Sequence, residues 1–217
     1  MDIDFSQVFI QFSVLLLSLT FHEAAHAWSA DRLGDATARM LGRVSLNPAV
    51  HIDPIGTIAF PLIAMVTGLP IIGWAKPVPV NTLNLRHHWK QKFMLIAAAG
   101  PASNLILATI AAIGVRLMGF ETGPDGTAGA IFQFLGVMVL INVLLAVFNM
   151  VPVPPLDGGN VLAGLLPGTA HEVFERIRPY GFLIIYGLLL SGILFAIVDP
   201  IQRVLLRWLL YVNLPLL

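Results

Sequence analysis

Residues 5–28 read FSQVFIQFSVLLLSLTFHEAAHAW, an apolar run that is long enough to cross a membrane and ends in a cluster of ionisable side chains. The hydrocarbon core of a bilayer is about 30 Å thick, and a helix needs roughly 20 residues to cross it. Hydrophobic residues make up 57% of the 217-residue chain and charged residues only 11%, whereas soluble domains average about 25% charged residues. We therefore expect a polytopic membrane protein.

Four further apolar segments follow the first one. Their approximate bounds are residues 54–73, 93–118, 127–150 and 180–198. The pattern predicts an all-α polytopic membrane protein with four to six transmembrane helices, a re-entrant or irregular segment, and short extended pieces between the first helix and the helix that carries the GPxxN sequence. Residues 201–212 carry Arg203 and Arg207 four positions apart, which indicates an interfacial amphipathic helix.

The composition excludes several kinds of site. The formal net charge is zero, so charge gives no argument for a nucleic-acid partner, and none is expected. Because the chain has no cysteine, it can form no disulfide, Cys-ligated zinc site, Fe–S cluster or cysteine nucleophile. We expect one membrane domain over residues 1–217, with a core at about 5–166 and C-terminal helices at about 180–213. The acidic start and the lack of a small-residue cleavage site predict that the first helix is retained.

The distribution of Lys and Arg predicts which side of the membrane each loop faces. Loops 31–53, 76–92 and 169–178 are basic, whereas the amino terminus and the loop at 119–126 carry only acids. Cytoplasmic loops of membrane proteins are enriched in Lys and Arg. The first helix should therefore run from the outer face to the cytoplasmic face.

The HEAAH sequence is the strongest indication of chemistry. His22 and His26 are four residues apart on one helix face, so both imidazoles can reach one tetrahedral metal ion, and neutral imidazole nitrogen suits Zn²⁺. Glu23 can accept a proton from a water molecule that attacks a peptide carbonyl. Ionisable side chains in an apolar helix are costly without a function. The alternative is that they only mark the helix end and are satisfied by neighbouring groups.

Asp157 is the best candidate for a third metal ligand. Hydrolytic zinc sites usually have three protein ligands and keep one position for water. Asp157 follows the fourth apolar segment within PPLDGG, residues 154–159. The prolines restrict this backbone, while Gly158 and Gly159 permit a tight turn beside a metal. The alternative is that Asp157 caps the N-terminus of a following helix.

Three motifs, in this order and at this spacing, resemble the site-2 protease family of intramembrane zinc metalloproteases. They are His22-Glu-Ala-Ala-His26, Gly100-Pro-Ala-Ser-Asn104 and NMVPVPPLDGG at residues 149–159. The resemblance covers about residues 12–166 and implies one Zn²⁺ per chain, bound by His22, His26 and Asp157, with Glu23 as the general base. LGRVSLNP, HIDP and GWAKPVP, which begin at Leu41, His51 and Gly73, resemble the compact branch that has no PDZ or CBS domain.

A shared metal constrains the topology. Its ligands must lie at one membrane face, so the first and fourth apolar segments must run in the same direction, with 93–118 crossing back between them. Residues 54–73 then cannot be a simple span, and both their flanks are basic, so we predict that they dip into the membrane and return, or lie in a pocket of the protein. The alternative is an ordinary kinked helix. Val78-Pro79-Val80 should be extended and offer an edge to an unwound substrate.

Asn104 and Asn149 lie in or at the ends of apolar segments. Their amides could support the substrate backbone or the developing oxyanion. The resemblance favours this role, and hydrogen bonding between helices is the alternative. Asn142 is expected to serve packing between helices. None of the other histidines is expected to be a metal ligand: His51, His87, His88 and His171. The last three are expected to be solvated.

Together these features predict an intramembrane zinc endopeptidase that hydrolyses peptide bonds of membrane-spanning substrate proteins, as in regulated intramembrane proteolysis. We expect a multi-pass protein of the cell membrane, a prokaryotic inner or plasma membrane, in contact with the lipid bilayer and with its active site toward the cytoplasmic face. A metal-binding membrane transporter and a catalytically silent scaffold that binds membrane segments are the alternatives. A transporter would not need Glu23 beside its first ligand. The sequence identifies neither the substrate nor the oligomeric state.

Overall fold

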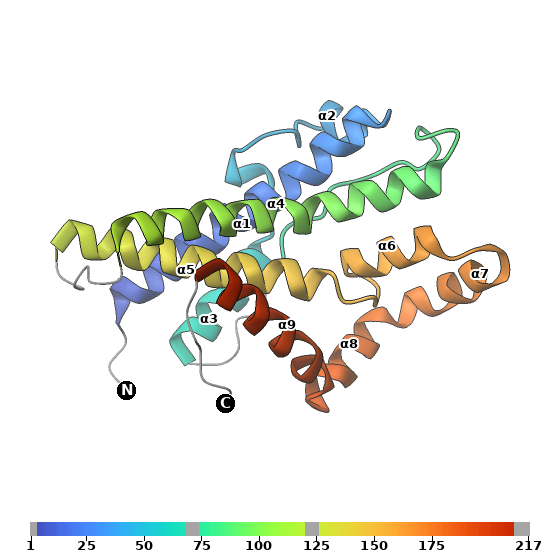
Figure 1. Cartoon of the computed structure of the whole chain (residues 1–217). Helices are drawn as coiled ribbons and strands as arrows, with labels where there is room; N and C mark the ends of the chain where they lie inside the picture. The colour runs from blue at the N-terminus through green and yellow to red at the C-terminus, as the bar shows by residue number, and fades with distance from the viewer. Residues whose placement is uncertain (1–3, 68–73, 120–125, 211–217) are drawn as a thin grey trace.

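The computed structural model describes residues 4–67, 74–119 and 126–210, and within these ranges all regular structure is helical. In chain order the helices are α1 (Phe5–Arg32), α2 (Thr37–Met40), the 3₁₀-helix η1 (Pro48–Val50), the π-helix η2 (Pro54–Ala59), α3 (Phe60–Thr67), α4 (Trp89–Met118), α5 (Gly126–Asn149), α6 (Asp157–Leu165), α7 (Gly168–Ile177), the 3₁₀-helix η3 (Arg178–Tyr180), α8 (Gly181–Leu190) and α9 (Ile193–Leu210). Figure 1 shows their arrangement. The predicted all-α class is confirmed.

Three helices of the described chain are long and apolar enough to cross a membrane. These are α1, α4 and α5, with 28, 30 and 24 residues. At about 1.5 Å per residue, each exceeds the roughly 30 Å of a hydrocarbon core. The bent pair formed by residues 168–190 and α9 would provide a fourth span if it is counted as one. The described residues thus reach the lower end of the predicted four to six spans only when this pair is included.

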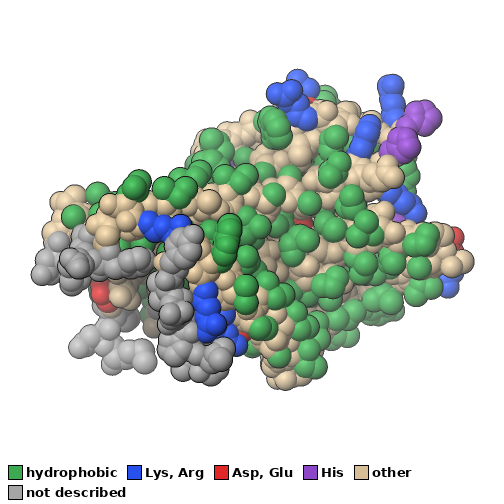
Figure 2. All heavy atoms as spheres, in the orientation of Figure 1, with side chains coloured by type: hydrophobic (Ala, Val, Ile, Leu, Met, Phe, Trp, Pro, Cys, Tyr) green, Lys and Arg blue, Asp and Glu red, His purple; other side chains and the backbone are tan. Residues whose placement is uncertain are grey.

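The surface of these helices is widely apolar. Figure 2 shows hydrophobic side chains spread over the visible face, while a group of Lys, Arg and His side chains lies at the end where α2 and the start of α4 are found. Exposed large side chains on α4 and α8 include Ile106, Ile110, Leu117, Leu183 and Leu190. Apolar surface of this extent fits a lipid environment, as expected for a multi-pass membrane protein.

α4 lies at the centre of the packing and contacts α1, α5 and α6. In Figure 1, α1, α4 and α5 run alongside one another. Ala108, Ala111 and Ala112 are buried on α4, and Val139 and Val143 are buried opposite them on α5. Small side chains let helix backbones approach closely in membranes. The alanines of α4 therefore explain how one helix can contact so many neighbours.

Hydrogen bonds between helices fix their relative directions. From His22 to His26 along α1, the partners on α4 go back from Asn104 to Ile96, so α1 and α4 are antiparallel. α5 follows α4 in the opposite direction, and Asp157, just beyond its end, contacts the same two histidines. α1 and α5 therefore run in the same direction, as a shared metal requires.

The segment predicted to dip and return comes back beside its own start. The Trp74 N–H donates to the Gly56 carbonyl at 3.0 Å, and the Thr57 hydroxyl donates to the Trp74 carbonyl at 2.8 Å. Between them, α3 has only 8 residues, about 12 Å of helix, which is too short to span a bilayer. The described ends of the segment 54–73 thus fit a re-entrant hairpin rather than a kinked span, while residues 68–73 lie outside the described residues.

The C-terminal apolar segment differs from the prediction. Residues 180–198 were expected to form one run, but α8 and α9 are separated at Ser191 and Gly192, and the helical arms on either side of this break are bent by 77°. Gly192 has φ of 76°, a left-handed conformation that glycine adopts without steric cost. Residues 201–210 are helical as predicted, but they continue α9 through Pro200. The interfacial position of this helix stays a prediction.

Candidate metal centre

His22, His26 and Asp157 meet at one point. The two Nε2 atoms lie 3.1 Å apart, Oδ2 of Asp157 lies 3.1 Å from Nε2 of His22, and Oδ1 lies 3.4 Å from Nε2 of His26. One ligand atom from each residue falls within 4.8 Å of the others, and both histidines are buried. Among the described residues this is the one group of three or more His, Asp or Glu side chains able to share a metal ion.

The turn that delivers Asp157 depends on two glycines. A Cβ atom at Gly158 would lie 2.3 Å from the Met150 carbonyl oxygen, and one at Gly159 would lie 2.7 Å from the Pro154 nitrogen. Any side chain at either position would therefore force the turn apart. Asp157 is the first residue of α6 and its carboxylate makes no capping hydrogen bond to that helix, so the alternative role as an N-cap is wrong.

Hydrogen bonds on the far side of each imidazole ring fix the nitrogen that faces the centre. Nδ1 of His26 lies 2.7 Å from the Ile96 carbonyl oxygen, which can only accept, so Nδ1 carries the proton. Nδ1 of His22 lies 2.6 Å from Oδ1 of Asn104. When each ring is neutral, Nε2 is then left with its lone pair toward the centre, which is the state that binds a metal.

A buried chain of hydrogen bonds fixes the orientation of the Asn104 amide. Its Nδ2 donates to Oδ1 of Asn142 at 2.8 Å, while Nδ2 of Asn142 donates to the Ser18 hydroxyl at 2.8 Å and to the Met138 carbonyl at 2.9 Å. The Ser18 hydroxyl in turn donates to the Val14 carbonyl at 2.7 Å. Each assignment requires the next, so Oδ1 of Asn104 must accept the histidine proton.

The residues at this point fit a zinc ion. With the protons assigned, the Nε2 atoms and the Asp157 carboxylate face one another through lone pairs, and Oδ2 of Asp157 is buried without a hydrogen-bond donor among the described residues. Such a cluster is repulsive unless a cation lies within it. Two imidazoles and a carboxylate are a donor set typical of hydrolytic zinc. Gly100 leaves room, because a Cβ atom there would lie 2.4 Å from Nε2 of His26 and 2.6 Å from Nε2 of His22.

Glu23 lies between the two histidines in the sequence, and all three side chains line one cavity. The cavity has a volume of about 300 Å³ and is bounded by α1, α4, the start of α6 and residues 77–80. Glu23 is buried, and its Oε2 accepts the Val78 N–H at 3.1 Å. A carboxylate in this position can accept and donate protons next to a metal ion that the histidines would hold.

The segment at 74–80, which forms no helix or strand, is anchored close to the point where it meets Glu23. The buried guanidinium of Arg43 donates to the carbonyls of Lys76 and Pro77. The Lys76 N–H donates to the His51 carbonyl at 2.9 Å. His51 itself lies outside the metal cluster, with Nε2 2.8 Å from the Ser45 carbonyl oxygen. Arg43 therefore holds the backbone whose next N–H contacts Glu23.

Asp35 joins the loop after α1 to the loop before α4. Its carboxylate accepts the Asn81 N–H at 2.7 Å, Nδ2 of Asn84 at 2.7 Å and the Thr37 N–H at 3.1 Å. Burial acts to raise the pKa of Asp35, but these hydrogen bonds and that of the Thr37 hydroxyl lower it below its ordinary value. Two loops predicted to be cytoplasmic are thus held together at the metal end of the helices.

The predicted supporting amides occupy different places. Asn149 lines the cavity, and its Nδ2 donates to the Leu145 carbonyl at 2.9 Å. Asn104 is fully buried and contacts His22 instead of the cavity. This placement favours the orientation of His22 as the role of Asn104, while support of the substrate stays a prediction for Asn149. Asn142, expected to serve packing alone, belongs to the chain of hydrogen bonds that fixes Asn104.

Comparison with known proteins gives the following similarities. A family model described as Peptidase family M50 matches residues 120–192, which include Asp157 but not the HEAAH sequence. The chain is 38% identical over 182 residues to YwhC of Bacillus subtilis (strain 168), and the alignment covers 78% of this chain and 75% of YwhC. It is 32% identical over 183 residues to Rip2 of Mycolicibacterium smegmatis, covering 81% of this chain and 64% of Rip2. Both relatives are named as zinc metalloproteases, and no solved structure matches the chain.

Proposed function

Because this chain belongs to peptidase family M50, a family of metalloproteases, we propose that it is an intramembrane zinc endopeptidase that cleaves membrane-spanning proteins. One observation carries the proposal: His22, His26 and Asp157 converge within 4.8 Å, with Glu23 in the same cavity. The two histidines lie on a helix of membrane length. A peptide bond that reaches them would therefore be cut within or near the bilayer.

In this proposal the chain holds one zinc ion through His22, His26 and Asp157. Such an ion would lower the pKa of a bound water molecule and polarise the scissile carbonyl. Glu23 accepts the proton of the attacking water and passes it to the leaving amine. The Val78 N–H orients one oxygen of Glu23 at 3.1 Å, which leaves the other oxygen for the proton. The family relationship and the geometry of these residues support the assignment.

The substrate backbone is proposed to lie along residues 77–80. The N–H groups of a helical substrate are occupied by internal hydrogen bonds, so its helix must unwind before a peptide bond becomes accessible. An extended segment offers such a strand an edge. Val78, Val80, Phe93 and Ile96 line the cavity and suit the apolar side chains of a membrane segment. Asn149 would support the substrate backbone through its amide.

We further propose that the protein is a single domain of the cell membrane with its metal centre toward the cytoplasm. The loops at 31–53 and 76–92 are basic, and basic loops favour the cytoplasmic side. These two loops are joined through Asp35 at the metal end of α1. Water would then reach the centre from the cytoplasmic face.

Cleavage of a single-pass membrane protein by the purified enzyme in proteoliposomes tests the proposal. Wild type should cleave, lose activity when a chelator removes zinc, and regain it when zinc is restored. Glu23→Gln should retain its zinc and abolish cleavage, because the amide cannot accept the proton. Glu172→Gln, at an exposed position on α7 outside the cavity, serves as the matched control and should cleave like wild type. Full activity of Glu23→Gln, or metal flux without proteolysis, would refute the proposal.

A further inference from the structure

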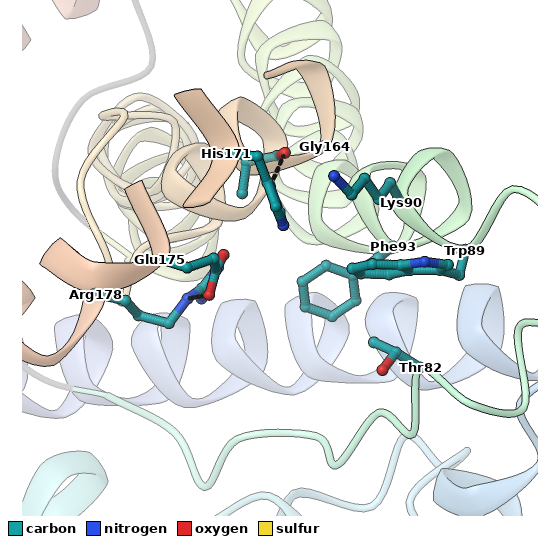
Figure 3. Close-up of a pocket in the computed structure, with 9 residues that line it drawn as sticks. Thr82, Trp89, Lys90, Phe93, Gly164, His171, Glu175 and Arg178 are labelled. Carbon is teal, nitrogen blue, oxygen red and sulfur yellow. Dashed lines mark hydrogen bonds and ion pairs between the residues drawn. The ribbon is translucent and has the colours of Figure 1, made fainter. Parts of the chain in front are cut away.

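A second cavity, of about 380 Å³, lies between the start of α4, the helices α6 and α7, and η3. Figure 3 shows its lining residues pointing toward one another. Trp89, Lys90 and Phe93 come from α4, while His171, Glu175 and Arg178 come from α7 and η3. We call this cavity the cationic pocket. His171 was expected to be solvated, and the structure corrects this, because it is half-buried and its Nδ1 lies 2.9 Å from the Ala163 carbonyl oxygen.

The cationic pocket is one helical turn from the metal cavity along two helices. Phe93 lines both cavities, and Ile96, one turn further along α4, lines the metal cavity. On α6, Asn160 lines the metal cavity, while Ala163 lines the cationic pocket. Arg178 also connects them, because its Nη1 donates to Oδ1 of Asn160 at 2.7 Å. Along α4, Lys90 lies six residues before Ile96, whose carbonyl contacts His26, and ten residues before Gly100, which borders Nε2 of both histidines. At about 1.5 Å per residue these separations are about 9 and 15 Å, the length of roughly three to five residues of extended chain.

The pocket has an excess of positive charge. Glu175 is neutralised by Arg178, whose Nε and Nη2 donate to its two carboxylate oxygens at 2.8 and 2.7 Å. No carboxylate of the described residues lies within ion-pair distance of Lys90, whose Nζ lies 5.8 Å from the centre of the Trp89 ring. His171 presents its second ring nitrogen to the pocket, since Nδ1 must donate to the Ala163 carbonyl oxygen.

We propose that the cationic pocket is a substrate subsite for an acidic side chain, Asp or Glu. This residue would lie about three to five residues from the scissile bond, in the part of the substrate that leaves the metal cavity toward the start of α4. Lys90 would pair with the carboxylate, and Trp89 and Phe93 would pack against the stem. The inference rests on the proposed protease function. A substrate side chain is favoured over a lipid phosphate because the pocket shares Phe93 with the metal cavity.

A matched series of single-pass substrates tests the subsite. Glu and Gln are placed in turn at each of about six positions on either side of the scissile bond, and kcat/KM is measured in proteoliposomes. Wild type should prefer Glu over Gln about tenfold between the third and fifth positions on one side only. Lys90→Met should lose this preference while cleaving the Gln substrate like wild type. Arg176→Met, which removes one charge from an exposed position of α7 outside the pocket, should keep the preference.

Binding provides a readout that does not depend on turnover. In the Glu23→Gln background, fluorescence anisotropy should show tighter binding of the Glu substrate than of the Gln substrate, and Lys90→Met should remove the difference. If the protein with Lys90 intact binds and cleaves the Glu and Gln substrates equally, the subsite is overturned and the protease function is left intact. If wild type shows no zinc-dependent cleavage of any substrate, both the subsite and the protease function are overturned. An effect of Lys90→Met that appears only in bilayers with anionic lipid, and not with the substrate series, would assign the pocket to lipid and overturn the inference.

Discussion

Nδ1 of His22 lies 2.6 Å from Oδ1 of Asn104, so a candidate metal ligand on α1 is oriented by the last residue of the GPxxN sequence on α4. Both residues are buried, and the amide is fixed in turn by Asn142 on α5. The tautomer of His22 therefore depends on contacts among α1, α4 and α5, the three helices of membrane length. Several expected outcomes depend on it and on the contacts around it.

Replacement of Asn104 by Leu should weaken zinc binding. Without Oδ1 of Asn104 to accept the Nδ1 proton, His22 is free to carry its proton on Nε2, the nitrogen that faces the centre. Loss of such a partner typically lowers metal affinity or activity about 10–100-fold. Competition with a chromophoric chelator measures the affinity. Thr109→Val, which removes a polar group from an exposed position of the same helix, is the control. Unchanged affinity in Asn104→Leu would exclude the positioning role.

Replacement of Gly100 by Ala should displace the metal ligands. The added methyl group would lie 2.4 Å from Nε2 of His26, far inside van der Waals contact, so either the ring or the helix must move. We expect loss of stoichiometric zinc and of cleavage. Gly136→Ala adds the same methyl group to α5 where no atom lies within 4 Å, and should retain both. A Gly100→Ala protein that binds zinc like wild type would contradict the position of α4.

Replacement of Arg43 by Lys should raise KM more than it lowers kcat. Nη2 of Arg43 donates to two consecutive carbonyls, at Lys76 and Pro77, and a Lys side chain ends one bond short of that nitrogen, so its ammonium group would not hold both. A loosened 77–80 segment would bind substrate less well, with an expected rise in KM of about 3- to 10-fold and unchanged zinc content. Arg39→Lys, at an exposed arginine that pairs with the half-buried Asp31, is the control. Equal loss in both variants, or a change in kcat alone, would exclude a role in substrate binding.

Asp35 predicts a dependence of stability on acid pH. Its pKa in the folded protein lies below the ordinary value, so its contribution is present above the ordinary carboxyl pKa, about 4, and is lost as the pH falls through the folded pKa. Asp35→Asn should destabilise the protein by about 1–3 kcal/mol at neutral pH and show a smaller loss of stability between neutral pH and pH 3. Thermal unfolding in detergent across this range measures both. Parallel curves for the two proteins would contradict the prediction.

The sequence indicated that His22, His26 and Asp157 would meet, because the patterns that carry them are local. A spacing of four on a helix sets His22 and His26 on one face, and the turn around Asp157 is restricted by prolines and glycines. The same metal required α1 and α5 to run in one direction, and the contacts bear this out. The return of 54–73 followed from its basic flanks and the metal together.

Other features depend on contacts between distant segments that leave little trace in local sequence. Arg43 reads as one basic loop residue, and its burial against the backbone of residues 76–77 appears only in three dimensions. His171 looked solvated because its neighbours are polar, yet α6 and α4 enclose it. The break at Gly192 was missed because hydropathy stays high across it, so the apolar pattern concealed a single residue with positive φ.

The most direct test of the central claim is metal analysis combined with zinc X-ray absorption of the purified protein and its Asp157→Asn variant. Wild type should carry one zinc per chain, bound by two imidazoles and a carboxylate oxygen without sulfur, and Asp157→Asn should lose the carboxylate from the spectrum together with most of the bound zinc. Metal-free wild type that still cleaves its substrate, or a zinc spectrum unchanged by Asp157→Asn, would contradict the account.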